Sequence, residues 1–384
     1  MEKTYFTIHR YALDIFKKNL KEIHNQYINS GRRLVMFSTN VIAGMTVNYF
    51  KKTELNIEFV VDNSKARQGT KFFDKTVYSP DYLNENYDEN YLILIASSFQ
   101  NEMIEQLEKY GYKYGKQIIK IIDLPELMND YSYVDRTGEH PLNREQVKEV
   151  QLGILRKIKE CSEKYGIRYY LSSGTAIGAV RHGGYIPWDD DADVFVPIDD
   201  FLKLINILKD DSQYKIVSQF NTGYYFGTGV SYMIDCNTIC DFNKFPIQIT
   251  MGQSVDIFPL YGIPDDEQKK DIYVKTVKDL EDKCLIAIED DERIKAVNEL
   301  NNFLLRYKYD ECKLIGNVLM PSFLKDVFAK EVFGKGVEKE FEGMSLILPD
   351  KYDEYLTQLY GNYMELPPVE KRKGEHYYHT YYIK

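Results

Sequence analysis

Four aspartates stand within five positions, at Asp189, Asp190, Asp191 and Asp193, and an apolar segment follows them at once. If a strand begins at Asp189, alternate side chains share a face and three carboxylates align. Such carboxylates would lie about 6–7 Å apart and repel each other by about 2–3 kcal/mol at an effective dielectric of about 20. A divalent cation would relieve that repulsion, and hard oxygen ligands favour Mg²⁺ or Mn²⁺ over zinc. The alternative is a solvated acidic loop, which the apolar residues on both sides disfavour.

A further acid, Asp256, lies inside the apolar segment 254–258, which we expect to end at Pro259. A lone carboxylate between Val and Ile is costly unless it is paired or binds a metal. We therefore predict that Asp256 converges with Asp191 and Asp193, although they are far apart in the sequence. On the acidic run itself, we expect Asp190 to point to the opposite face as a structural residue.

The acids are preceded by a predicted strand at 167–172 and a short helix that extends through Val180. Ser173, Gly174 and Thr175 stand at the junction, where small residues let backbone N–H groups face an anion. A simple helix cap is the alternative. Strand, small residues, helix, Asp-x-Asp and then a lone strand Asp is the layout of the nucleotidyltransferase fold, in which carboxylates hold metal ions for phosphoryl displacement.

The run at residues 174–194, GTAIGAVRHGGYIPWDDDADV, closely resembles the signature of the LicD family of phosphotransferases. The resemblance continues in VDIFPL at residues 255–260, and in YGNYM at residues 360–364 with the segment that follows. It covers about residues 143–384. The fukutin-related proteins share the same Asp-rich core.

This resemblance implies transfer of a phospho-alcohol group from a CDP-activated donor to a hydroxyl of a cell-surface glycan or teichoic acid precursor, with release of CMP. Phosphocholine is the family's best-known group. The resemblance implies Asp191, Asp193 and Asp256 as ligands of Mg²⁺ or Mn²⁺. Asp189 completes the catalytic carboxylates, and either Asp189 or Asp256 is the base.

The resemblance also implies a set of substrate-binding residues. Their predicted roles are contacts with the donor phosphates (Ser173, Gly174, Thr175), charge stabilisation near the diphosphate (Arg181, His182) and closure over the site from the C-terminus (Lys371, Arg372, His376). A plain loop hydrogen bond is the alternative for His182, and a solvated basic tail is the alternative for the last three. We expect Trp188, the single Trp, to pack beneath the Asp strand.

Residues 1–125 alternate between strand and helix patterns, which predicts a parallel, doubly wound sheet. The predicted strands are 33–37, 57–61 and 91–96, and the predicted helices are 11–27, 41–50 and 101–110. This part resembles the small Rossmann-like domains that precede sugar-modifying enzymes. Ser38 begins a turn without the G-x-G-x-x-G glycines, and Asp62 stands 24 residues later, where a ribose-binding acid would stand. A nucleotide site is one interpretation; we favour a degenerate scaffold.

The fold class that follows is α/β and α+β, with a Rossmann-like domain at 1–125, a polar linker at 126–142 and a nucleotidyltransferase-like mixed-sheet domain at 143–384. The net charge of −10 disfavours general nucleic-acid binding. Five irregularly spaced cysteines indicate reduced thiols and a cytoplasmic location. The sequence shows neither a signal peptide nor a membrane-spanning run. The implied acceptor is compatible with peripheral attachment to the inner membrane face.

Two other functions remain open at this point. A nucleotidyltransferase on the same fold would make an NDP-activated product from an NTP and release pyrophosphate. A non-catalytic scaffold in glycan assembly would need none of the acids. The intact set of carboxylates disfavours the scaffold, because a retired site has no reason to hold like charges together.

Overall fold

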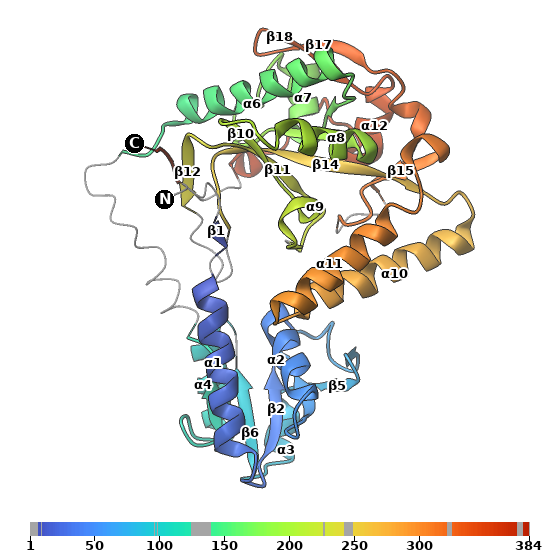
Figure 1. Cartoon of the computed structure of the whole chain (residues 1–384). Helices are drawn as coiled ribbons and strands as arrows, with labels where there is room; N and C mark the ends of the chain where they lie inside the picture. The colour runs from blue at the N-terminus through green and yellow to red at the C-terminus, as the bar shows by residue number, and fades with distance from the viewer. Residues whose placement is uncertain are drawn as a thin grey trace.

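The computed structural model describes residues 7–8, 10–95, 97, 99–123, 140–225, 227–241, 249–320, 325–374 and 379–383. Figure 1 shows an N-terminal part coloured from blue to teal and a C-terminal part from green to red, with α10 (Glu267–Ile286) and α11 (Asp290–Leu304) beside α2 of the N-terminal part. Among the helices described, none combines the length and apolar composition needed to cross a bilayer.

The N-terminal part is built on one six-stranded sheet. Its strands lie in the order β4 (Lys71–Phe72), β5 (Lys75–Tyr78), β3 (Ile57–Val61), β2 (Arg33–Phe37), β6 (Tyr91–Ile95) and β7 (Ile118–Lys120). Neighbouring strands are parallel except β4 and β5. All five residues of β6 are buried, as expected when both faces of a parallel sheet are covered. The predicted parallel, doubly wound fold is confirmed.

Helices of the N-terminal part follow the sequence pattern closely. They are α1 (Arg10–Tyr27), α2 (Val41–Lys51), α3 (Asp81–Glu85) and α4 (Gln100–Lys109). The three helices that we predicted agree with α1, α2 and α4 to within one residue at each end. α2 begins where Asn40 Oδ1 accepts a hydrogen bond from the Ala43 N–H at 2.8 Å, which is an ordinary N-cap. The short strands β4, β5 and β7 were missed because each is two to four residues long, has a lysine at one end and contains few apolar residues.

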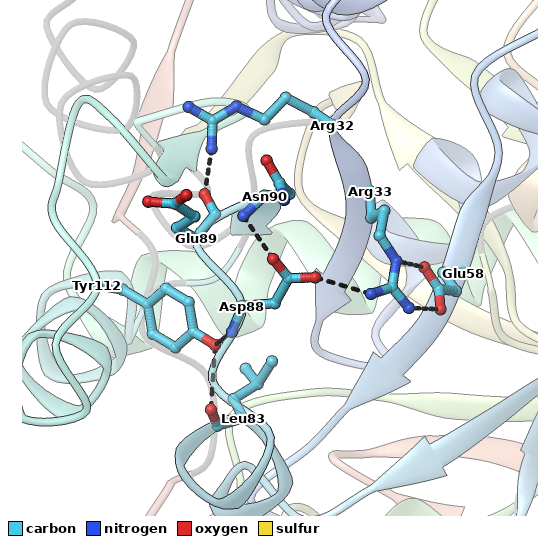
Figure 2. Close-up of polar contacts among 8 residues, drawn as sticks. All are labelled: Arg32, Arg33, Glu58, Leu83, Asp88, Glu89, Asn90 and Tyr112. Carbon is cyan, nitrogen blue, oxygen red and sulfur yellow. Dashed lines mark hydrogen bonds and ion pairs between the residues drawn. The ribbon is translucent and has the colours of Figure 1, made fainter.

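Charged side chains fix the amino end of β2 (Figure 2). Arg33 lies between two acids: its Nε donates to Glu58 at 2.7 Å and its Nη1 donates to Asp88 at 2.8 Å. The Tyr112 hydroxyl donates to the Leu83 carbonyl at 3.0 Å in the same region. These contacts lie at the opposite end of the sheet from the carboxyl ends of its strands, where ligands bind in doubly wound folds.

At the carboxyl end of the sheet, Asp62 is engaged by the protein's own loops. Its Oδ2 accepts hydrogen bonds from the Thr39 N–H at 2.8 Å and the Thr39 hydroxyl at 2.7 Å, and its Oδ1 accepts one from the Ser64 N–H at 2.8 Å. This pattern joins the turn after β2 to the turn after β3. These hydrogen bonds are consistent with a structural role for Asp62. Whether the domain is a degenerate scaffold or a nucleotide site stays a prediction.

The C-terminal part contains a seven-stranded mixed sheet. Its main path is β10 (Tyr214–Val217), β11 (Ser231–Asp235), β14 (Ser254–Ile263), β15 (Leu314–Gly316) and β16 (Val327–Ala329), and β9 (Asp193–Pro197) and β8 (Tyr170–Leu171) join it at β14. β9 is parallel to β14, whereas β11 and β15 are antiparallel to it. The predicted mixed sheet is therefore confirmed.

Helices and small sheets surround this sheet. The helices are α6 (Arg144–Tyr165), α7 (Ser173–Arg181), α8 (Ile198–Leu208), α9 (Gln219–Thr222) and α12 (Tyr352–Tyr360). Two-stranded sheets pair β1 (Thr7–Ile8) with β13 (Ile249–Thr250), β12 (Thr238–Asp241) with β19 (His379–Tyr382), and β17 (Val337–Phe341) with β18 (Met344–Leu348). Asn143 and Gln146 form the capping box that starts α6, which agrees with the sequence pattern.

β14 is longer than predicted, because Pro259 does not end it. The Asp256 N–H donates to the Ala192 carbonyl, so N–H groups at even positions of β14 face the chain of β9. The N–H that Pro259 lacks would face the other side, where the register with β11 ends at Ile257. The missing donor therefore breaks no hydrogen bond of the sheet, which is the setting that tolerates proline.

The turn between α10 and α11 joins the two parts. Asn48 Nδ2 donates to the Ile286 carbonyl at 3.0 Å, and Lys17 pairs with Glu289 at 3.1 Å. Ile288 is buried in the hydrophobic cluster of the N-terminal sheet, although it follows β9 and β14 in sequence. The domain boundaries at 1–125, 126–142 and 143–384 stay predictions, and most of the predicted linker lies outside the described residues.

Candidate active site

Two strands that are distant in sequence bring their acids together. β9 and β14 run parallel, and Asp193 is the direct register partner of Asp256. Residues opposite each other on adjacent strands project to the same face, with backbones about 4.8 Å apart. The two carboxylates therefore lie on one face of the sheet, which is the convergence that the sequence led us to expect.

Asp193 occupies the most enclosed position of the acidic set. Its side chain is 6% exposed, and its backbone N–H donates to Thr175 Oγ1 at 2.8 Å. Burial and the nearby charges of Asp191, Asp256 and Asp189 raise the pKa of Asp193 well above its usual range, while a hydrogen bond from the Ser173 side chain opposes the rise. Three carboxylates thus disfavour the charged form of a buried fourth, and a bound cation would relieve this repulsion.

Residues 189–191 form a loop, which corrects the expectation for Asp190. The strand begins at Asp193, so side chains at 189–191 do not alternate between faces. Carboxylate oxygens of Asp189, Asp190 and Asp191 lie within 4.8 Å of one another. The prediction that Asp190 points away is therefore wrong, because the Asp189 N–H closes a turn on the Ile186 carbonyl at 2.9 Å and the backbone is irregular.

Side chains of α6 hold this loop from behind. Arg144 Nη2 donates to the Asp189 carbonyl at 2.5 Å, and Gln151 Nε2 donates to the Asp190 carbonyl at 3.1 Å. Both contacts are with backbone oxygens, so they fix the loop without engaging its carboxylates.

The start of α7 meets the acids from the other side. Ser173 has a φ of 49°, in the left-handed region that an L-residue adopts at a cost. A Cβ on Gly174 would overlap the Asp189 carboxylate, so glycine permits this approach. Thr175 is 1% exposed and its hydroxyl holds the Asp193 backbone, so its observed contact is structural. The predicted phosphate-binding roles of these residues stay predictions. The strand before them is shorter than predicted and covers Tyr170–Leu171.

Two tyrosines of α12 complete the surroundings of Ser173, and sequence reasoning gave neither a role. The Tyr355 hydroxyl accepts a hydrogen bond from the Ser173 N–H at 2.9 Å. Tyr360, which is 46% exposed, reaches the Ser173 side chain. The resemblance singled out residues 360–364, but among 33 tyrosines nothing else distinguished these two.

Two arginines, Arg181 at the end of α7 and Arg372 in the C-terminal segment, lie near each other. Arg181 Nη1 donates to the Tyr363 carbonyl at 2.5 Å and the Glu365 carbonyl at 3.3 Å. Burial and the positive charge of Arg372 lower the pKa of Arg181, so two guanidinium groups lie near each other. Such a pair favours an anionic ligand.

The C-terminal segment also reaches the acids directly. A Cβ on Gly374 would overlap the Asp190 carboxylate, and the Arg372 guanidinium lies 5.4 Å from the Trp188 ring centre. Trp188 is half-buried against the core, with the exposed His182 ring 6.4 Å away. Lys371 is exposed in the same segment. His376 lies outside the described residues, so its predicted role in closure is unexamined by the structure.

Among the described residues, the atoms gathered here that could bind a metal ion are carboxylate oxygens. Such ligands fit a hard cation such as Mg²⁺ or Mn²⁺. A family described as "LicD/FKTN/FKRP, nucleotidyltransferase domain" matches residues 166–281, which include all five acids. The "Lipopolysaccharide cholinephosphotransferase LicD" of Haemophilus influenzae is 30% identical over 263 residues, which are 61% of this chain and 96% of that protein. The chain belongs to the LicD family.

Other relatives of this LicD family member match shorter segments. "Ribitol 5-phosphate transferase FKRP" of human and of mouse is 47% identical over 38 residues, 10% of this chain and 8% of those proteins. Residues 2–122 match a different family, described as "C-methyltransferase C-terminal domain". A solved structure, "UDP-D-Quinovosamine 4-Dehydrogenase from Vibrio fischeri", is 19% identical, covers 26% of this chain and 85% of that chain, and has a TM-score of 0.22.

The family match ends at residue 281, so it leaves out part of the site of this LicD protein. Tyr355 and Tyr360 of α12 and the segment with Lys371 and Arg372 all lie beyond it. In the structure Tyr355 contacts Ser173, Arg372 lies over Trp188, and Gly374 of the same segment lies against Asp190.

Proposed function

We propose that this protein transfers a phospho-alcohol group, with phosphocholine as the first candidate, from a CDP-activated donor to a hydroxyl of a cell-surface glycan or teichoic acid precursor. The register pairing of Asp193 with Asp256 carries the proposal, because it gathers acids from two parts of the chain on one face. Membership of the LicD family supports it, since the Haemophilus influenzae relative is named a cholinephosphotransferase.

In this reaction the acceptor oxygen bonds to the distal phosphorus of the donor. The bond from that phosphorus to the oxygen of CMP breaks, and CMP leaves. The acceptor proton passes to a carboxylate, for which Asp189 and Asp256 are the candidates. The role requires a carboxylate beside the acceptor hydroxyl, and both acids act electrostatically on buried Asp193.

Asp191, Asp193 and Asp256 would hold Mg²⁺ or Mn²⁺, which when bound supplies positive charge to the diphosphate. Arg181 and Arg372 would add charge from the protein, and Ser173 and Gly174 would face the donor phosphates. The proposed acceptor is a membrane-attached precursor, so the proposal includes loose association of the protein with the inner membrane face.

The test is a CMP-release assay with Mg²⁺ across CDP-choline, CDP-ethanolamine, CDP-glycerol and CDP-ribitol, with glycan acceptors. We expect release with at least one donor, and a fall of about 10²-fold or more in D193N and D256N, because both remove charge where it must be balanced. The matched control is D210N, at an exposed aspartate just after α8.

Three results would contradict the proposal. Pyrophosphate release from CTP, without CMP release from any CDP-alcohol, would favour a nucleotidyltransferase. Absence of both reactions together with absence of Mn²⁺ binding would favour a scaffold. If D193N turned over at the wild-type rate, the acidic cluster would have no role in the mechanism.

A further inference from the structure

The β17–β18 hairpin carries an unusual residue at its tip. Phe341 pairs with Met344, so Glu342 and Gly343 form a two-residue turn, and their φ values are 49° and 76°. Turns with two positive φ values favour Asn-Gly or Asp-Gly. An ordinary L-residue in the left-handed region costs about 1–2 kcal/mol. The local backbone therefore disfavours glutamate at position 342, and such a residue suggests a role elsewhere.

The Glu342 side chain contacts the loop that leads to the acids. Its Oε1 accepts a hydrogen bond from the Tyr185 N–H at 3.0 Å, and its own N–H donates to the Gly183 carbonyl at 3.0 Å. A Cβ on Gly184 would overlap the Glu342 carboxylate. The hairpin tip thus touches three consecutive residues of the loop, and glycine at 184 allows the contact.

The same hairpin also packs against the ring of Tyr185. The Tyr185 and Phe341 rings lie 4.9 Å apart in an edge-to-face arrangement, and Tyr185 is 5% exposed. Its hydroxyl is buried without a hydrogen-bond partner in the described part of the chain. Packing and the Glu342 hydrogen bond, instead of a hydroxyl contact, therefore fix the position of Tyr185.

Helix α7 holds the loop from the opposite side. A Cβ on Gly178 would overlap the Gly184 carbonyl, and the His182 N–H donates to the Gly178 carbonyl at 2.8 Å. Gly184 and Tyr185, which are buried, therefore lie between α7 and the hairpin tip. Only four positions separate Tyr185 from Asp189, and the turn closed on the Ile186 carbonyl makes that connection compact. Displacement of Tyr185 would therefore displace the acids.

We infer that Glu342 is a positioning residue for the acidic loop: by holding the Tyr185 N–H, it keeps Asp189 and Asp191 beside Asp193. The inference rests on the proposed cation-dependent reaction. It adds a residue outside the matched family segment, on an element that contributes no acid to the cluster. Glu342 Oε1 is the atom through which this turn reaches the loop.

The test compares two substitutions at one position. Asn suits a positive φ but is one methylene shorter, so E342N relaxes the turn and loses the contact with Tyr185. Gln keeps an oxygen acceptor at the same reach, so E342Q preserves it. We expect E342N to melt close to the wild-type temperature, because the relaxed turn offsets the lost hydrogen bond, and to bind Mn²⁺ about 10–100-fold more weakly. We expect E342Q to bind within about twofold of wild type, in keeping with retained positioning.

A control variant and a second measurement keep the inference testable. E338Q changes a glutamate of the same hairpin that contacts Ser345, so its Mn²⁺ affinity should equal that of wild type. Amide hydrogen exchange over residues 183–191, followed by mass spectrometry without metal, should be faster in E342N and unchanged in E342Q. This exchange measurement decides the inference even if the wild-type protein binds no Mn²⁺, a result that would contradict the proposed function separately.

Two outcomes would overturn the inference. One is exchange and Mn²⁺ affinity in E342N equal to those of wild type. The other is a lowered melting temperature in E342N with equal losses in E342Q, because that pattern indicates a hairpin that depends on glutamate for its own folding.

Discussion

At the scale of single residues, Gly174 shows how closely the site is packed. The Gly174 Cα faces the Asp189 carboxylate, and a methyl group there would overlap Asp189 Oδ2. We predict that G174A lowers kcat/KM by about 10²-fold, because displacing a reacting group by about 1 Å can cost that much. The melting temperature should change little, because the overlapping atom is the end of the Asp189 side chain, which can rotate away.

The matched control for this prediction is G153A in α6. Its added methyl would meet only the Tyr214 hydroxyl, at 3.2 Å, and we expect unchanged kinetics. Steady-state CMP release and thermal melts of both variants provide the measurement. Equal activity of G174A and wild type would show that the Asp189 carboxylate is free to move without loss.

A buried acid away from the site gives a prediction about pH. Glu281 is 5% exposed, and the Tyr225 hydroxyl donates to it. Burial raises the pKa of Glu281 above its usual value of 4.5. The folded state then binds more protons than the unfolded state, so this group's contribution to stability is present below pH 4.5 and is lost as pH rises through the folded pKa.

We therefore expect the free energy of unfolding of E281Q to rise relative to that of wild type as pH increases from 4.5, because Gln cannot ionise. Urea denaturation at a series of pH values measures the difference. E267Q, at a 77% exposed position in the same helix, is the control and should show a flat difference. If the difference in unfolding free energy between E281Q and wild type is also independent of pH, burial does not raise the pKa of Glu281.

At the scale of elements, one hydroxyl connects α7 to β9. Thr175 Oγ1 accepts the hydrogen bond of the buried Asp193 N–H. We predict that T175V lowers the free energy of unfolding by about 1–3 kcal/mol, because it leaves a buried donor unsatisfied. T175S keeps the acceptor and should lose less than about 1 kcal/mol, near the value of one buried methyl group.

Urea denaturation of both variants tests this prediction, and CMP release shows whether the acid moves with the strand. Equal destabilisation by T175V and T175S would assign the effect to packing of the methyl group. In that case the hydrogen bond would not be the connection between the helix and the strand.

The sequence correctly predicted those helices and strands whose pattern lies within a few neighbouring residues. β2 and β3 have the bounds that their apolar runs gave, and α6 starts at the predicted cap, because these features depend on neighbouring residues. The end of β14 was wrong, because the tolerance of Pro259 depends on where β11 stops. A pairing partner far along the chain leaves no trace at the proline itself.

The same distinction holds for the site. Acids within an apolar context indicated a cation site, and the register of β9 with β14 brings Asp193 and Asp256 together. The side on which Asp190 lies was wrong, because a turn replaces the expected strand. The sequence analysis gave Tyr360 and Glu342 no role. Tyr360 is one of many tyrosines and Glu342 lies in a hairpin, so only their contacts in the structure distinguish them.

At the scale of the whole molecule, the α10–α11 turn makes the N-terminal sheet depend on the C-terminal part. Ile288 is 2% exposed within the N-terminal hydrophobic cluster, while the helices on either side of it extend toward the mixed sheet. The Asn48 hydrogen bond, the Lys17–Glu289 pair and the Lys52–Glu292 pair surround the same turn. Exposed ion pairs contribute little, so the apolar contact should dominate the coupling.

We predict that I288A weakens this coupling by about 2–5 kcal/mol, the usual cost of truncating a buried aliphatic side chain. In calorimetry, the N-terminal sheet of I288A should then melt in a separate transition at a lower temperature, whereas we expect the wild-type protein to melt in a single transition. I294A, which truncates a 48% exposed isoleucine of α11, should keep a single transition. If I288A and I294A melt alike, the two parts fold independently, and the contacts at the turn only set their orientation. If they differ as expected, the N-terminal sheet needs the C-terminal part for its stability, because one of its own core residues comes from beyond the acid-bearing strands β9 and β14.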